Sequence, residues 1–319
     1  MTSEAGLHSV ADEAPAPTSA ERTKPPFGYF GAKQRLASQI IESLPPHNCW
    51  VEAFCGSSAI TLAKSPAPIE VINDLDGEVT NVFEQLRNNS EALCRAVALT
   101  PYAREEFELA RFGPPATDAL ERARRFLVGT MMTINSTIAK RRTCGFSYSQ
   151  SFVRGGMEAR VSRWVNLPER LLQVVERFKR VRIEKKDARD MVRMFLDRPA
   201  TLMYLDPPYF VKREHGYVID AKDESFHREL LGLCTRSRAM ILLSGYHNKV
   251  YDSLLTKKNG WHSVRIAALT RDSTGKDYKR TEVLWRNSHF IKALRTGKVP
   301  IRLSRTEIKE NKVNPPRKR

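Results

Sequence analysis

Short apolar runs alternate with amphipathic helical patterns over most of the 319-residue chain. Parallel strands must be joined by long crossovers, usually helices, so this alternation predicts a mainly parallel, three-layer α/β sheet. The last two apolar runs flank the polar segment 270–280, which predicts an antiparallel closing hairpin. The expected strands are 48–54, 68–74, 180–185, 200–206, 239–245, 261–269 and 281–287, and the helices between them are expected to begin near 57, 76, 188, 224 and 248.

The interval from about residue 90 to 180 breaks this alternation. Helical patterns cover 102–112, 119–140 and 163–179, around a loop rich in Gly, Ser, aromatic and basic residues. An interruption of this length is too long for a simple connection within a compact sheet. We therefore expect an inserted, largely helical domain.

The two ends of the chain lack the periodicity of its middle. Residues 1–25 are rich in Ala and Pro and predict a disordered leader, with neither the basic start nor the apolar stretch of a signal peptide. From residue 292 onward there are ten Lys or Arg and only two Glu, a net charge of +8. We expect residues 291–319 to form a flexible basic arm.

Charge and composition restrict the classes of function. The chain has 53 Lys and Arg against 36 Asp and Glu, a formal net charge of +17, which favours a polyanionic partner, nucleic acid before an anionic membrane. No apolar run approaches the roughly 18 residues of a membrane span. The five cysteines and seven histidines are scattered without ligand-like pairs. We therefore expect a protein of the reducing cytoplasm, with neither a disulfide framework nor a structural zinc site.

An acid, a small-residue turn and a helix start follow one another in VEAFCGSSAITLAK, residues 51–64. Such a strand–turn–helix unit lets a ligand approach the backbone at the C-terminal edge of a sheet, where nucleotide-like cofactors bind. The segment is neither a G-x-G-x-x-G fingerprint nor a P-loop. Taken alone, it is more simply explained as an ordinary strand–helix turn.

A second acid follows the next expected strand, which ends in Asn73-Asp74 about 20 residues after the first turn. Folds of this class place there a carboxylate that accepts hydrogen bonds from a ribose. The alternative is local, because Asp76 with Glu78 can cap the following helix and Asp74 can serve the turn. In combination with the first turn, the ribose role of Asp74 is favoured.

The stretch YLDPPYF, residues 204–210, ends an expected buried strand with a carboxylate and two prolines. Two prolines remove two amide donors and stop the strand, so a solvent-facing turn is the simplest explanation of such a stretch in isolation. At the ligand-binding edge of the sheet, Asp206 and the Pro207 carbonyl can both accept hydrogen bonds from one amino group. Tyr209 offers a flat face beside them. Together these groups suit a planar ring with an exocyclic NH2.

The order of these segments closely resembles that of the D12-class, Dam-like N6-adenine DNA methyltransferases. The resemblance rests on YFGAKQRL (29–36), VEAFCGSSAI (51–60), IND (72–74), DPPY (206–209) and TEVLWRN (281–287). It runs in register over about residues 26–290. It implies an S-adenosylmethionine-dependent enzyme with a Rossmann-like seven-stranded methyltransferase sheet, mostly parallel with an antiparallel closing hairpin.

The resemblance also implies how the chain is divided. A helical target-recognition domain, residues 91–180, would be inserted between the two parts of the methyltransferase domain, 26–90 and 181–290. This matches the interruption of the strand–helix alternation. Double-stranded DNA would be the partner, a cognate restriction endonuclease of a restriction-modification system would be a second one, and the protein would act as a monomer.

Individual roles carry over onto the matching positions. An N-terminal motif would help to close the cofactor pocket, a loop would hold the cofactor, one acid would bind its ribose and another would lie near its adenine. The N-terminal motif would be Tyr29, Gly31 and Lys33, and the cofactor loop would be Glu52, Phe54 and Gly56. Asp74 would bind the ribose, and Asp187 would lie near the adenine. The catalytic tetrapeptide would be Asp206, Pro207, Pro208 and Tyr209.

Two positions depart from the family pattern. Where the family usually has the second Gly of a G-x-G, this chain has Ser58, which suits that place if its φ is negative. Gly-Ala-Lys at residues 31–33 replaces a common Gly-Gly-Lys, which is a smaller change.

The implied reaction methylates N6 of an adenine. Because N6 lies inside the duplex, the base must be flipped out, at a cost of a few kcal/mol. Tyr209 would stack on the ring, while Asp206 and the Pro207 carbonyl would bind the two amino protons. The nitrogen would then be more nucleophilic and aligned for attack on the sulfonium methyl, with no metal or covalent enzyme intermediate required.

The stretch 139–156 combines basic and aromatic residues, the expected components of a nucleic-acid surface. For each residue singly, a solvated loop with packed aromatic side chains is nearly as good an explanation. The candidates for DNA contact are Lys140, Arg141, Arg142, Tyr148 and Arg154.

Two alternative functions stay open. D-P-P-Y also serves methyl transfer to cytosine N4 and to RNA or glutamine amides, although the order of motifs favours adenine in DNA. The other alternative is a nucleic-acid-binding protein with an inactive methyltransferase fold. The intact Asp206 and Tyr209 argue against it, whereas Ser58 is compatible with it.

Overall fold

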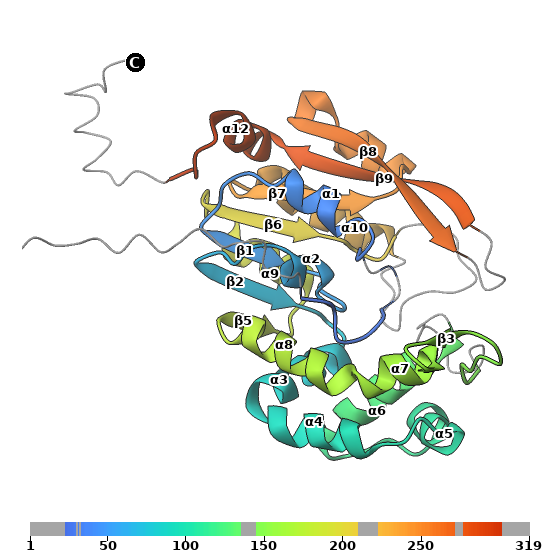
Figure 1. Cartoon of the computed structure of the whole chain (residues 1–319). Helices are drawn as coiled ribbons and strands as arrows, with labels where there is room; N and C mark the ends of the chain where they lie inside the picture. Colours follow the sequence, from blue (N-terminus) through green and yellow to red (C-terminus); the bar gives the residue numbers. More distant parts are fainter. Residues whose placement is uncertain are drawn as a thin grey trace, which may run out of the picture.

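A seven-stranded sheet forms the centre of the computed structural model, which describes residues 23–29, 31, 33–134, 145–209, 223–271 and 277–301. The strand order is β5-β2-β1-β6-β7-β9-β8, and β9 runs antiparallel to both of its neighbours (Figure 1). The other pairs are parallel, which confirms the predicted α/β sheet with its closing hairpin. The strands are β1 (Cys49–Glu52), β2 (Ile69–Asn73), β5 (Val181–Glu184), β6 (Thr201–Leu205), β7 (Met240–Gly245), β8 (Trp261–Arg271) and β9 (Asp277–Asn287).

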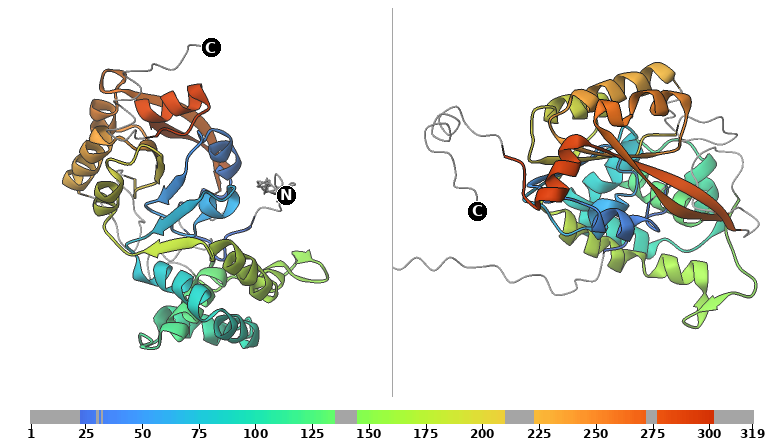
Figure 2. Two further views of the ribbon diagram at one scale, coloured as in Figure 1. Left: turned by 90° about the vertical axis from the view of Figure 1, so that its left-hand side faces the viewer. Right: turned by 90° about the horizontal axis from the view of Figure 1, so that it is seen from above.

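Helices cover both faces of this sheet (Figure 2). On one face α9, α10 and α11 pack against the strands, and on the other face α1, α2 and α12 do so. The bounds are α1 (Ala37–Glu42), α2 (Ala59–Ala63), α9 (Ala188–Phe195), α10 (Glu224–Arg236), α11 (Lys249–Leu254), with the short 3-10 turn η2 (Lys257–Asn259) after it, and α12 (Ser288–Thr296).

Neighbouring residues of the central strands enter opposite hydrophobic clusters. In β6, Met203 packs toward α9–α11, whereas Leu202 and Tyr204 pack toward α1, α2 and α12. Side chains alternate across a strand, so a strand buried on both faces needs apolar residues at every position. This is why the central strands are continuous apolar runs in the sequence.

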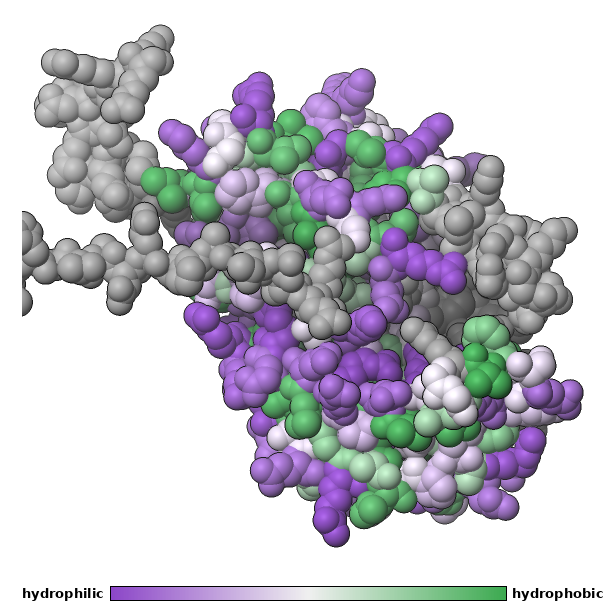
Figure 3. Space-filling model, viewed as in Figure 1, coloured by the Kyte–Doolittle hydropathy of each residue, from purple (hydrophilic) through white to green (hydrophobic). Residues whose placement is uncertain are grey.

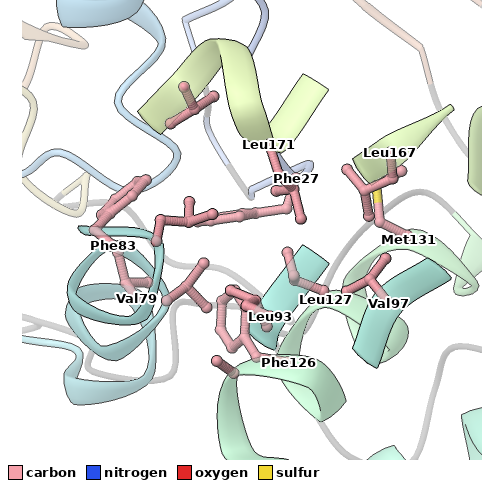
Figure 4. Packing of buried hydrophobic residues seen from close by; sticks show 14 of the residues in the cluster. Phe27, Val79, Phe83, Leu93, Val97, Phe126, Leu127, Met131, Leu167 and Leu171 are labelled. Carbon is pink, nitrogen blue, oxygen red and sulfur yellow. The ribbon is translucent and has the colours of Figure 1, made fainter. Parts of the chain in front are cut away.

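A helical layer lies beyond the β5 edge of the sheet (Figure 1). Its core includes Phe27 from the N-terminal segment, whose ring lies 5.7 Å from that of Phe83 and 5.0 Å from that of Phe126 (Figure 4). Ile72 of β2 and Val181 of β5 belong to the same hydrophobic cluster, so the layer and the sheet share a continuous core. The helices are α3 (Gly77–Asn88), α4 (Ser90–Leu99), α5 (Arg104–Phe112), α6 (Ala119–Met131), α7 (Ala159–Val165) and α8 (Leu167–Phe178).

The structure differs from expectation inside the interval 90–180. A short hairpin, β3 (Val153–Arg154) and β4 (Met157–Glu158), lies within the segment expected to be a loop. Gly155 and Gly156 join its strands at φ 61° and 78°, a conformation that glycine adopts without strain. The expected single helix at 163–179 is instead two helices, α7 and α8, separated by Asn166.

The C-terminal segment also differs from expectation at its start. α12 occupies Ser288–Thr296, and its Phe290 and Ala293 are buried against the sheet. The side chain of Asn287 caps this helix by accepting a hydrogen bond from the Phe290 amide at 3.0 Å. The beginning of the expected flexible arm is therefore folded. Residues 302–319 of the arm and residues 1–22 of the leader lie outside the described part of the chain.

Hydrophilic side chains are spread over both the sheet and the helical layer on the face shown in Figure 3, interrupted by smaller hydrophobic groups. Among the exposed hydrophobic groups of the chain are Phe152 and Val153 at the β3–β4 hairpin, with 67% and 62% of their surface accessible. Within the described ranges, no helix is long and apolar enough to cross a membrane.

Candidate active site

A cavity of about 500 Å³ lies at the C-terminal ends of β1, β2 and β6. The chain leaves β1 toward β2 on one side and reaches β6 on the other, so the cavity lies at the topological switch point of the sheet, where α/β proteins bind ligands. The residues lining it include Tyr29, Gly31, Lys33, Glu52, Phe54, Gly56, Asp74 and Asp187, with Asp206 and Pro208 beside them. The structure thus brings every predicted cofactor residue to one cavity, together with two residues of the tetrapeptide; their roles remain predictions.

The turn after β1 approaches the cavity closely at Gly56. Its φ is 48°, and a Cβ there would lie 2.6 Å from the Tyr29 ring. The Gly56 amide donates to Asp74 at 2.8 Å. Both the backbone conformation and the surrounding space therefore require glycine at this position.

Ser58 does not meet the condition of a negative φ under which a serine would suit this position. Its φ is 55°, in the left-handed region, which is uncommon for a residue other than glycine. The turn thus keeps the conformation that a glycine would favour. The serine hydroxyl adds a hydrogen bond of 3.2 Å to Glu52.

Glu52 is a buried carboxyl at the floor of the cavity. One of its oxygens accepts hydrogen bonds from the amide and hydroxyl of Thr61 and from the Ser58 hydroxyl. Burial raises the pKa of Glu52 to about 7, although these hydrogen bonds act in the opposite direction. The group is therefore a well-held acceptor whose negative charge is costly in this buried position.

Asp74, which follows the neighbouring strand β2, stabilises the turn after β1 by hydrogen bonds. One oxygen accepts from the Gly56 amide at 2.8 Å and the other from the Asp76 amide at 3.0 Å, while burial raises the pKa of Asp74 to about 6. Asp76 caps α3 by accepting from the Glu78 amide at 2.9 Å. The local turn and cap roles are therefore present. A carboxylate oxygen accepts more than one hydrogen bond, so the ribose role of Asp74 remains a prediction.

Asp187 lies at the rim of the cavity and caps α9. Its side chain accepts from the Arg189 amide at 2.8 Å and forms an ion pair with the Arg189 guanidinium at 2.7 Å. This guanidinium holds the pKa of Asp187 below its usual value. Its place near a cofactor adenine remains a prediction.

Asn73 holds the cavity edge together and was not among the predicted site residues. Its amide nitrogen donates to the carbonyls of Ala53 at 2.9 Å and Lys186 at 3.0 Å, and its amide oxygen accepts from the Lys186 amide at 2.8 Å. It thereby ties the turns after β1 and β5 to the end of β2. This position needs a side chain that both donates and accepts hydrogen bonds, as an amide does. Its place in the IND motif was the signal from which the sequence could have identified Asn73 as a site residue.

Asp206 begins the tetrapeptide and is paired with Lys33. The Lys33 ammonium lies 2.6 Å from Oδ2 of Asp206, and both side chains are almost fully buried. Burial raises the pKa of Asp206 to about 6, whereas the Lys33 charge acts to lower it. The Tyr209 hydroxyl also lowers the pKa of Asp206, and it donates a hydrogen bond to Glu282. Oδ1 of Asp206 has no hydrogen-bond partner among the described residues.

Tyr209 lies at the other end of the tetrapeptide. Its ring meets the ring of Tyr246 edge-on, with centroids 4.5 Å apart, and the Lys33 ammonium lies 4.9 Å from its centre. Its hydroxyl donates to Glu282, which also accepts from the Ser244 hydroxyl at 2.7 Å. Sequence reasoning missed Glu282 and Ser244, although an acid inside the apolar run TEVLWRN was a signal that it has a buried partner.

The predicted DNA-contact residues are only partly covered by the structure. Lys140, Arg141 and Arg142 lie outside the described residues, as does the side chain of Arg154, whose backbone forms part of β3. Tyr148 is 60% exposed, and its contact with DNA remains a prediction.

Three arginines on α7 and α8 form a basic cluster that was not predicted: Arg160, Arg163 and Arg170. They are half-buried and have no carboxylate partner in the part of the chain that the structure describes. Burial lowers the pKa of Arg163, and it lowers the pKa of Arg170 to about 10; in each case a neighbouring arginine adds to the effect. Uncompensated, partly buried cations of this kind favour an anionic ligand.

Comparison with known proteins identifies the family. The sequence model of the D12 class N6 adenine-specific DNA methyltransferases matches residues 29–265. Among solved structures, the chain is similar to precorrin 8w decarboxylase from Methanobacterium thermoautotrophicum at 10% identity, over 86% of this chain and 92% of that chain, with a TM-score of 0.34. Curated proteins give no match. Because the family match spans most of the chain and includes both the cavity turns and D-P-P-Y, the chain belongs to the D12 class N6 adenine-specific DNA methyltransferase family.

Proposed function

We propose that this protein transfers a methyl group from S-adenosylmethionine to N6 of an adenine flipped out of duplex DNA. The observation that carries the proposal is the position of Asp206, whose Oδ1 is buried beside the cavity without a hydrogen-bond partner among the described residues. A buried acceptor costs free energy unless a ligand supplies a donor. The exocyclic amino group of adenine is such a donor.

The cavity fits the cofactor in volume and in the chemistry of its lining. About 500 Å³ is in the usual range for a small-molecule site, and the close backbone approach at Gly56 would be lost with any side chain. Glu52 is placed to accept hydrogen bonds from the ammonium group of the cofactor, and Asp74 from its ribose hydroxyls. When bound, S-adenosylmethionine supplies an electrophilic methyl group on a sulfonium.

The tetrapeptide would prepare the adenine amino group. Asp206 and the Pro207 carbonyl accept hydrogen bonds from its two protons, which makes the nitrogen lone pair more available, while Tyr209 stacks on the ring. The N6–methyl bond forms as the carbon–sulfur bond breaks, and N6 then releases one proton to solvent. Because Asp206 has a pKa of about 6, it is charged and able to accept hydrogen bonds at neutral pH.

The helical layer would recognise the DNA, with residues 91–180 as the target-recognition part. Its basic cluster on α7 and α8 suits the phosphates, and the exposed Tyr148 and Phe152 suit displaced or neighbouring bases. The arm at 302–319 would add salt-sensitive, non-specific affinity.

Methyl transfer to DNA tests this proposal. Wild-type protein and an Asp206→Ala variant are incubated with labelled S-adenosylmethionine and plasmid DNA, and the modified nucleoside is identified by mass spectrometry. We expect N6-methyladenine with the wild type and at least a ~100-fold lower rate with the variant, because both acceptor and alignment are lost. Calorimetric titration should show that the variant still binds the cofactor.

The alternatives give different outcomes in the same assay. Formation of N4-methylcytosine would identify cytosine as the target base, and methylation of RNA but not DNA would identify RNA as the substrate. Equal incorporation with Asp206→Ala would refute the mechanism. DNA binding with no transfer by the wild type would indicate the inactive homologue.

A further inference from the structure

Glu282 is a buried acid on β9, outside the segment that the family model matches. Only 4% of its side chain is exposed, and the next three residues along the strand are buried hydrophobic groups. The pairing of Val283 with Gly245 at the end of β7 places Glu282 beside the D-P-P-Y tetrapeptide. A buried carboxylate is costly unless it is paired, so its partners indicate its purpose.

One oxygen of Glu282 contacts three side chains from three separate segments of the chain. Oε1 accepts hydrogen bonds from the Tyr209 hydroxyl and, at 2.7 Å, from the Ser244 hydroxyl at the end of β7. The Lys33 ammonium lies 3.7 Å from the same oxygen and 2.6 Å from Oδ2 of Asp206. Burial raises the pKa of Tyr209 well above its usual value, so its hydroxyl is protonated and acts as the donor.

Resting on the proposed function, we propose that Glu282 is a positioning residue: it fixes Tyr209 as the platform for the flipped base and shares Lys33 with Asp206. The Tyr209 ring is held at its hydroxyl end by Glu282 and along its side by the Tyr246 ring. A ring held in this way loses no rotational freedom when the base stacks on it, which favours binding and alignment.

Lys33 interacts with both Glu282 and Asp206, and this interaction determines which oxygen of Asp206 is available to the substrate. Lys33 lies between the two acids and contacts Oδ2 of Asp206, and Oδ1 is left without a partner among the described residues. Glu282 thus helps to hold the ammonium against Oδ2 of Asp206. Oδ1 is then the oxygen that accepts from the adenine amino group.

The charge of Glu282 also acts directly on Asp206. It is one of the influences that raise the pKa of Asp206, and Lys33 and the Tyr209 hydroxyl act against it. Removing this charge should therefore shift the acid limb of the activity profile to lower pH. Among the described residues, Glu52, Tyr204 and Tyr251 also interact electrostatically with Asp206, and all three are buried.

Three variants separate the hydrogen bond from the charge. Glu282→Gln keeps an oxygen acceptor for Tyr209, so single-turnover methylation at pH 8 should stay within about threefold of wild type while the acid limb moves to lower pH. Glu282→Ala loses both, and its rate should fall about tenfold at all pH values. Tyr209→Phe keeps the ring and loses its anchor, so it should show a similar loss at pH 8. Cofactor affinity should be unchanged in all three.

A matched control is Asp190→Asn, which removes the charge of a carboxylate paired with Arg193 at 2.6 Å on α9, outside both the cavity lining and the target-recognition part. It should leave both the rate and the acid limb at wild-type values. An unmoved acid limb in Glu282→Gln would overturn the charge role. Wild-type rates in both Glu282→Ala and Tyr209→Phe would overturn the platform role; if Glu282→Ala does not fold, Tyr209→Phe alone decides it.

A measurement without DNA separates failure of this inference from failure of the proposed function. Fluorine NMR of protein labelled with 3-fluorotyrosine gives a Tyr209 resonance that Tyr209→Phe identifies by its loss. Glu282→Ala should shift this resonance, whereas Glu282→Gln should largely retain it. Absence of methyl transfer by the wild type would reject the proposed function, and an unchanged resonance in Glu282→Ala would reject the anchoring of Tyr209.

Discussion

Gly56 shows at the scale of one residue how the backbone shapes the cavity. Its positive φ disfavours a side chain, and a Cβ would also meet the Tyr29 ring at 2.6 Å. Tyr29 itself lines the cavity. A substitution at Gly56 therefore acts on folding through strain and on ligand binding through displacement of Tyr29.

We expect Gly56→Ala to lower the affinity for S-adenosylmethionine about tenfold, because the Tyr29 ring must shift into the cavity. Gly297→Ala is the matched control, since Gly297 ends α12 at φ 61° with open space where its Cβ would lie. Both variants carry backbone strain and should melt at a lower temperature, but only Gly56→Ala should lose affinity in calorimetric titration. Equal affinities would show that the Tyr29 contact has no role in the cavity.

Helices α7 and α8 carry the basic cluster at the scale of secondary structure elements. Burial and repulsion by a neighbouring arginine lower the pKa of Arg163 and of Arg170. Positive charge held in this way is unfavourable in the free protein. It becomes favourable when phosphates approach.

Replacing Arg163 and Arg170 with Gln should weaken binding to duplex DNA and reduce the slope of log affinity against log salt by about 2, one released counterion for each lost phosphate contact. The same variant should be no less stable than wild type, because it removes repulsion. Arg193→Gln is the control, since Arg193 on α9 is already paired with Asp190 at 2.6 Å. Fluorescence anisotropy of a labelled duplex at several salt concentrations measures the slope, and an unchanged slope would exclude contact with phosphates.

At the scale of the whole molecule, the sheet gathers three buried carboxyls around one cavity. Burial raises the pKa of Glu52 to about 7 and the pKa of Asp74 and of Asp206 to about 6. The folded state therefore binds more protons than the unfolded state between about pH 4 and 7. The stability that these groups contribute at low pH is therefore lost progressively as pH rises from about 4 to about 7.

The contribution of one group can be isolated by substitution. The free energy of unfolding of Glu52→Gln, relative to wild type without ligand, should increase as pH rises from 5 to 8, because only the wild type must ionise a buried carboxyl. Glu121→Gln is the opposite control. Glu121 has its pKa lowered to about 2 by Arg124, so the difference from wild type should be constant above about pH 5. Urea unfolding at several pH values measures both, and parallel curves for Glu52→Gln and wild type would contradict the expected burial.

Particular residues show how far the sequence predicts the site. Asp206 and the prolines end a continuous apolar run, so their place at the edge of a buried strand follows from local pattern. The hairpin at 153–158 and the helix 288–296 were missed because short strands and a basic amphipathic helix depend on what packs against them. The φ of Ser58 could not be predicted, because its residue type favours a negative value.

Local sequence patterns were sufficient to predict the alternation of strands and helices, the family, and the acids that follow each strand. Those features depend on local hydrophobic period and on the residues that end an element. The contacts between distant side chains became visible only in the folded chain: Lys33 pairs with Asp206 across 173 residues, and Tyr209 forms a hydrogen bond with Glu282 across 73. Such contacts depend on strand order and register, which are set by packing of the whole chain rather than by any one segment.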